Sequence, residues 1–152
     1  MTTTVIIGAG NELMKDEGVG VHAIRILQDE LCDSRPDIKL MDVGTSSDFG
    51  HLIEGADKLV IVDAVEGGCE PGTIYRFTPQ QIESESRLTT SFHQIGILEN
   101  FRMMELMGMK IAETVIIGVE PAEVEVGLSL SPEIELRMPK IIQSVLDEIY
   151  HQ

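Results

Sequence analysis

Three short stretches of this sequence are almost entirely aliphatic and lack the alternation of apolar and polar residues that is typical of a half-exposed strand. They lie within Thr4–Gly8, Lys58–Val62 and Thr114–Val119. Strands of this composition are covered on both faces, as in a parallel sheet enclosed by helices. Between them the spacing of apolar residues becomes helical, for example over Val19–Leu31. The sequence therefore predicts an α/β fold.

The order of the expected elements defines the fold class more closely. Strands are expected at Thr4–Gly8, Asp37–Val43, Lys58–Val62, Thr73–Thr78 and Thr114–Val119, and helices at Val19–Leu31, Phe49–Ile53, Ile95–Met107 and Pro132–Tyr150, with Pro79–Thr90 as a loop of at most one helical turn. This order predicts a single domain over residues 1–152, a three-layer αβα sandwich around a mostly parallel, twisted sheet of about five strands. A flavodoxin-like strand order, 2-1-3-4, would place the ends of the first and third strands side by side.

Charge and cysteine content exclude several classes of protein. The formal net charge of −15 argues against nucleic-acid binding and against anionic membrane surfaces, because both require clusters of Lys and Arg. Cys32 and Cys69 form no CxxC pair, which argues against a disulfide framework and a thiolate zinc site. The sequence has neither a signal-peptide pattern nor an apolar stretch of about 18 residues. We therefore expect a cytoplasmic protein, and a monomer.

Acidic residues follow three of the predicted strands, and one histidine precedes a predicted helix. Glu17, Asp42 and Asp63 follow the first, second and third strands, and His93 lies just before the apolar helix. The carboxyl ends of parallel strands share one edge of the sheet, so these side chains can meet there. Carboxylates and an imidazole in one crevice have the chemistry of a divalent-metal site or of acid–base hydrolysis.

Each of these residues also has an ordinary structural interpretation. Asp16 is expected to cap a helix, whereas Glu17, between Asp16 and the small residues Gly18 and Gly20, is either left accessible to a ligand or is a solvated acid. Asp63 either caps a loop or is a ligand or catalytic group. Asp42 can accept a hydrogen bond within its own turn, bind a ribose, or supply a second carboxylate.

The candidate residues other than the acids differ in whether neighbouring residues support a functional role. The helix start at His93 favours the neutral imidazole, which is the form that binds a metal. The remaining histidines have no such context, and Cys69 has no visible base beside it. Gly8 and Gly10 begin like a dinucleotide fingerprint, but the third glycine is absent and the following acids would repel a pyrophosphate. We expect these two glycines to permit a tight turn with positive φ.

Taken together, these motifs resemble those of the hydrogenase maturation endopeptidases, over essentially the whole chain. The matching residues are Gly8-x-Gly10-Asn11-x-Leu13-x-x-Asp16-Glu17-Gly18-x-Gly20, Asp42-x-Gly44-Thr45, Val62-Asp63-Ala64, the segment around His93, Gly118-x-x-Pro121 and Gly127-Leu128-Ser129-x-Ser131. Members of that family remove a C-terminal extension from the large-subunit precursor of nickel–iron hydrogenases. The resemblance implies a twisted five-stranded sheet flanked by helices.

The resemblance also implies roles for individual residues. Glu17, Asp63 and His93 would contact nickel that the substrate supplies, and Asp42 and Asp63 would take part in hydrolysis. The partner would be the hydrogenase large-subunit precursor. Three alternatives stay open on the residues alone: a stand-alone divalent-metal hydrolase, a nucleotide-binding regulatory module, and a non-catalytic chaperone of the subunit.

Overall fold

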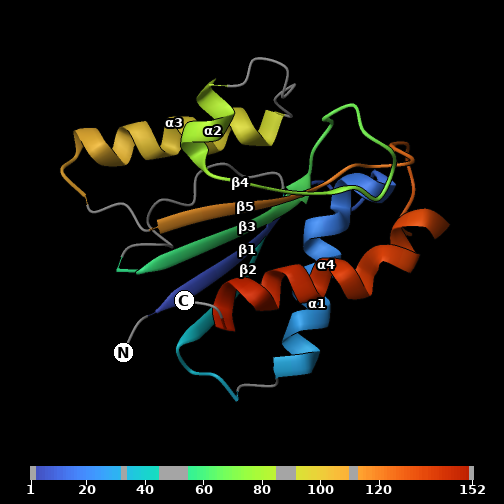
Figure 1. Ribbon diagram of the computed structural model, residues 1–152, viewed down its shortest axis with the longest axis horizontal. Helices are drawn as coiled ribbons and strands as arrows, with labels where there is room; N and C mark the ends of the chain where they lie inside the picture. Colours follow the sequence, from blue (N-terminus) through green and yellow to red (C-terminus); the bar gives the residue numbers. More distant parts are fainter. Residues whose placement is uncertain (1–2, 32–33, 45–54, 85–91, 110–112, 151–152) are drawn as a thin grey trace.

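A computed structural model describes residues 3–31, 34–44, 55–84, 92–109 and 113–150, without the side chains of 82–84 and 92–98. Five strands form one sheet in the order β2-β1-β3-β5-β4 (Figure 1). They span Thr4–Ala9 (β1), Ile38–Gly44 (β2), Lys58–Ala64 (β3), Ile74–Phe77 (β4) and Glu113–Val119 (β5). All pairs are parallel except β4 with β5. The predicted fold class and the neighbouring ends of the first and third strands are confirmed.

The helices cover both faces of this sheet (Figure 1). They span Val19–Leu31 (α1), Pro79–Ser84 (α2), Phe92–Leu106 (α3) and Pro132–Tyr150 (α4), and a 3-10 helix, η1, spans Lys15–Gly18. Side chains alternate along each strand, so Ile6 and Val60 pack with α1 and α4 while Ile7 and Ile61 pack with Phe101 of α3. Strands β1, β3 and β5 are mostly apolar because both of their faces are core. No helix within the described ranges has the length and apolar character needed to cross a membrane.

Two predicted segments differ from the structure, and one lies outside it. Pro79–Ser84 is a helix where a loop was expected, because Thr78 and Gln81 form a capping box in which each backbone N–H bonds the other's side chain, at 2.8 and 3.4 Å. Helix α3 begins at Phe92, three residues before the predicted start at Ile95, and so includes His93. The expected helix at Phe49–Ile53 lies outside the described residues.

Glycines allow α1 to lie directly against the sheet. A β-carbon on Gly20 would come within 2.1 Å of the Val62 carbonyl oxygen and 2.5 Å of the Ala9 carbonyl oxygen. A β-carbon on Gly8 would likewise lie 2.2 Å from the Gly20 carbonyl oxygen. Gly18 is buried against the Glu12 backbone, and a β-carbon on Gly18 would lie 2.5 Å from the Glu12 α-carbon. The expectation that Gly18 and Gly20 serve to expose Glu17 is therefore wrong: they permit close packing, which fixes the position of η1.

We expect Gly20→Ala to destabilise the protein although alanine favours helix formation. The added methyl group meets backbone atoms of two strands that cannot move aside, which should lower the free energy of unfolding by about 2 kcal/mol despite a gain of about 1 kcal/mol in helix propensity. Urea denaturation measures the change. Gln28→Ala, on the exposed face of the same helix, is the control. Equal or higher stability of Gly20→Ala would contradict the close contact.

Candidate active site

Asp63 lies inside the protein at the carboxyl edge of the sheet. It is the second-last residue of β3, is fully buried, and pairs with Gly118 of β5. Its Oδ1 accepts a hydrogen bond from the Ala64 backbone N–H at 2.8 Å. Burial of a carboxylate is costly unless polar groups or an ion interact with it. Asp63 is therefore held in a fixed orientation by the end of its own strand.

Gly10 brings Glu17 and Asp63 to a common point. Its φ is +120°, and its N–H donates to the Gly44 carbonyl oxygen at 2.7 Å. A β-carbon here would lie 1.9 Å from the Glu17 carbonyl oxygen and 3.2 Å from Asp63 Oδ1. Only glycine permits this close approach of the Glu17 backbone. The turn after β1 thus places the half-buried Glu17 beside the end of β3, where η1 contacts that strand.

The expectation of a turn with positive φ holds for Gly10 alone of the two glycines. Gly8 is a residue of β1 that lies against Gly20, and it pairs with Asp42 of β2 and Val62 of β3. Its lack of a side chain serves helix packing and not the turn.

Asp42 lies on β2, which is separated by β1 from the strand that carries Asp63. It is exposed, and its Oδ1 accepts a hydrogen bond from the Gly44 N–H at 2.9 Å. The predicted turn with its own side chain is therefore confirmed. Strand β1 separates β2 from β3, so Asp42 and Asp63 approach the same edge from the two sides of β1.

His93 is the second residue of α3, as its predicted place at a helix start requires. Figure 1 shows that α3 begins on the side toward which the parallel strands point and runs back from there. The side chain of His93 lies outside the described residues. Among the side chains that are described, no group of three His, Cys, Asp or Glu could hold a metal ion. The three-residue set of Glu17, Asp63 and His93 stays a prediction.

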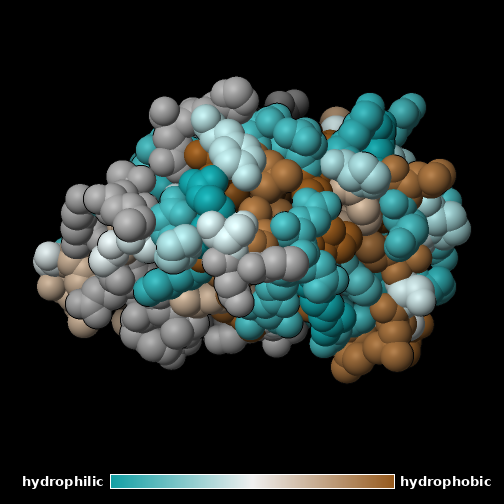
Figure 2. Space-filling view, turned by 90° about the horizontal axis from the view of Figure 1, so that it is seen from below, coloured by the Kyte–Doolittle hydropathy of each residue, from teal (hydrophilic) through white to brown (hydrophobic). Residues whose placement is uncertain are grey.

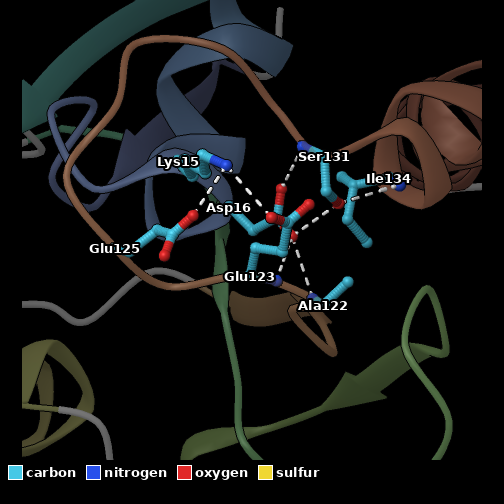
Figure 3. Close-up of polar contacts among 7 residues, drawn as sticks. All are labelled: Lys15, Asp16, Ala122, Glu123, Glu125, Ser131 and Ile134. Atoms are coloured by element: carbon cyan, nitrogen blue, oxygen red, sulfur yellow. Dashed lines mark hydrogen bonds and ion pairs between the residues drawn. The ribbon is translucent and has the colours of Figure 1, made fainter.

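The capping role expected for Asp16 is wrong. Its carboxylate is buried and accepts four hydrogen bonds, all from the segment between β5 and α4 (Figure 3). The donors are the backbone N–H groups of Ala122 (2.9 Å), Glu123 (2.8 Å) and Ser131 (2.7 Å) and the Ser131 hydroxyl (2.7 Å). Asp16 therefore fastens this distant segment to the loop that carries Glu17.

Ser131 links this contact to helix α4. Its hydroxyl donates to Asp16 and accepts the Ile134 N–H at 3.5 Å, while Pro132 occupies the first helical position. The sequence predicted the helix from Pro132 onward. Asp16, the partner of Ser131, could not be identified there because the two residues are far apart along the chain.

Lys15 forms a second connection between the same segments. Its Nζ lies 3.0 Å from Glu123 Oε1 and 2.9 Å from Glu125 Oε1 (Figure 3). The hydrogen bonds that the Lys15 ammonium donates to Glu125 and, second, to Glu123 raise its pKa. Lys15 adopts a positive φ of 47°, which places its backbone N–H 3.0 Å from the Gly127 carbonyl oxygen.

A buried glutamate that the sequence did not single out holds the loop after β3. Glu120 follows β5, and its Oε1 accepts hydrogen bonds from the Gly67 N–H (2.9 Å), the Cys69 N–H (3.2 Å) and the Tyr75 hydroxyl (2.6 Å). Burial, and then hydrogen bonding with Cys69 and Glu120, raises the pKa of the Tyr75 hydroxyl. The segment that follows Asp63 is thus tied to the end of the neighbouring strand.

The comparisons with known proteins now identify the family. The hydrogenase maturation protease family model matches residues 21–148. The chain belongs to this family. The matched region includes Asp42, Asp63 and His93 and begins after Glu17. The predicted resemblance is confirmed.

Individual relatives agree with this membership. The chain is 33% identical to the hydrogenase expression/formation protein HupD of Thiocapsa roseopersicina, over 94% of this chain and 66% of HupD. It is 31% identical to the coenzyme F420 hydrogenase subunit delta of Methanothermobacter thermautotrophicus, over 95% of this chain and 93% of that subunit. The chain thus spans slightly less than two thirds of HupD.

Solved structures show the same fold. The [NiFe] hydrogenase maturation protease HybD of Thermococcus kodakarensis superposes with a TM-score of 0.79 at 28% identity, covering 97% of this chain and 99% of HybD. HybD of E. coli gives a TM-score of 0.84 at 21% identity, covering 99% of this chain and 93% of HybD. This member of the family therefore shares the fold of HybD.

We expect Asp16→Asn to lower the free energy of unfolding by about 3 kcal/mol. The amide retains the shape of the side chain but turns an N–H₂ group toward buried donors, so at least one of them loses its acceptor. Urea denaturation monitored by circular dichroism measures the loss. Glu105→Gln, which neutralises an exposed acid on α3, should change stability by less than about 0.5 kcal/mol. Equal stability of the two variants would show that Asp16 does not fasten the segment.

Proposed function

We propose that this protein is an endopeptidase that removes the C-terminal extension of a nickel-loaded hydrogenase large-subunit precursor. Membership of the maturation protease family supports the reaction class. The observation that supports the site is that the backbone of Glu17 and the carboxylate of Asp63 both lie close to Gly10, at the carboxyl edge of the sheet. We further propose that the protein acts as a cytoplasmic monomer, without nucleic acid or membrane as a partner.

In this proposal the nickel belongs to the substrate, which holds it through cysteine thiolates close to the scissile bond. Glu17, Asp63 and His93 complete the coordination with two carboxylates and one imidazole. Such oxygen and nitrogen donors suit divalent nickel. The close contacts at Gly10 support this arrangement, because a side chain there would meet the Glu17 backbone and the Asp63 carboxylate. Coordination fixes the position of the precursor, and hence of the bond to be cut.

We propose that Asp42 is the general base of the hydrolysis. Its carboxylate is exposed and is oriented by the Gly44 N–H. In the reaction it takes a proton from a water molecule whose oxygen attacks the scissile carbonyl carbon. The proton then passes to the leaving amine as the carbon–nitrogen bond breaks. Nickel bound to Asp63 contributes by polarising the carbonyl group or by acidifying the water.

Substitution of the proposed ligands should stop processing without unfolding the protein. We expect Glu17→Gln, Asp63→Asn and His93→Ala each to reduce cleavage of nickel-loaded precursor by at least about 100-fold, because each removes a donor to the ion. Mass spectrometry of the precursor follows the reaction. Glu66→Gln removes an exposed acid near Asp63 and should leave the rate unchanged. Wild-type rates for all three variants would refute the site.

Processing should require nickel in the precursor and not on the purified enzyme. We expect cleavage of nickel-loaded precursor and none of nickel-free precursor, since three protein donors alone give incomplete coordination of the ion. The masses of both forms after incubation with equal enzyme decide the question. Equal cleavage of nickel-free precursor would instead favour a stand-alone metal hydrolase, and an unchanged mass of both forms would favour a chaperone.

A further inference from the structure

Four apolar side chains are exposed around the loops that frame the candidate site. They are Leu13, Val124, Val126 and Leu128, here called the apolar rim, and Val126 and Leu128 are 85% and 69% exposed. Figure 2 shows apolar surface gathered at the right-hand end of the molecule, the end at which Figure 1 shows the loops after β1 and β5. Contiguous exposed apolar residues in a globular protein commonly mark an interaction site.

The backbone beneath the apolar rim is held in place. Met14 and Gly127 form an isolated parallel bridge, in which the Gly127 N–H donates to the Leu13 carbonyl oxygen at 2.9 Å. Leu13 therefore lies on one segment beside Val126 on the other. A β-carbon on Gly127 would lie 3.0 Å from the Lys15 side chain, so that chain covers the glycine. The rim is thus a preformed surface, so a partner that binds it causes little further loss of conformational entropy.

The order of residues keeps the apolar side chains exposed. Glu123 and Glu125 alternate with Val124 and Val126, and both glutamates are engaged by Lys15. The two glutamates are thus held by Lys15. The apolar residues between them remain at the surface.

The negative charge around the apolar rim favours a partner that carries basic residues. Two glutamates share the single Lys15 ammonium, and the whole chain carries a net charge of −15. A second copy of the chain would bring the same acidic groups face to face, which is unfavourable. A segment with apolar side chains flanked by Lys or Arg is complementary to both the apolar and the acidic part of this surface.

We propose that the apolar rim is the docking surface for the precursor, and that it binds an apolar segment flanked by basic residues. This proposal rests on the proposed function. Leu13 belongs to the same loop as Glu17, and Asp16 joins that loop to the segment of Val126 and Leu128. A precursor whose nickel is bound at Glu17 therefore lies next to the rim. The rim binds protein surface, and the acidic site binds the ion.

The test is the double substitution Val126→Ser with Leu128→Ser. We expect KM for nickel-loaded precursor to rise about tenfold or more, with kcat unchanged, because docking is weakened while the ion site is intact. The matched control is Leu106→Ser with Met107→Ser, which changes two equally exposed apolar residues at the opposite end of α3. The control should keep the wild-type KM, and Val126→Met with Leu128→Met should restore most of the affinity.

Further measurements separate failure of this inference from failure of the proposed function. If the wild-type protein cuts the precursor and the serine variant has the same KM, the docking surface is wrong and the peptidase function stands. If the wild-type protein does not cut, binding of precursor to Asp63→Asn protein with and without the rim substitutions still tests docking. Dimerisation in sedimentation that the serine variant abolishes would overturn the inference in favour of self-association.

Discussion

The buried carboxylate of Asp16 holds together the two loops on which the candidate site depends. It lies in the turn between β1 and α1 and accepts hydrogen bonds from the backbone at both ends of the segment that precedes α4. A buried carboxylate is stable only when its oxygens are satisfied, and here four donors meet it. The contact therefore specifies one arrangement of the loops. Glu17 and Leu13 on one loop, and the rest of the apolar rim on the other, keep fixed positions because of it.

Close packing without side chains is the second requirement. Gly8 and Gly20 let α1 approach the sheet, and Gly10 lets the Glu17 backbone lie close to the end of β1. In sequence Gly8 and Gly10 resemble the start of a nucleotide-binding loop. In the structure Gly8 serves contact between a helix and the sheet, and Gly10 permits a tight turn beside Asp63. The same residue type answers two different steric needs, and only the neighbouring backbone distinguishes them.

Elements with strong local patterns were predicted well. The bounds of α1 and α4 match the structure, because an apolar stripe and the Ser131-Pro132 start signal are encoded within the helix itself. The place of β1 between β2 and β3 followed from general rules for parallel sheets, whereas the edge position of β4, antiparallel to β5, was not predicted. Helix α2 was predicted as at most one helical turn of a loop although Thr78 and Gln81 form a recognisable capping box. Its six residues carry too little apolar periodicity to indicate a helix.

The sequence by itself determined the α/β alternation, the acidic charge and the presence of carboxylates after the strands, since each of these is a property of adjacent residues. Only the tertiary structure decided what each carboxylate does. Asp16 and Glu17 are neighbours, yet one is buried among loop amides and the other lies half-buried beside Gly10. Successive side chains in a 3-10 helix point about 120° apart, so adjacent acids face different surroundings. The surroundings of Asp16 come from a segment more than 100 residues away, which no local pattern specifies.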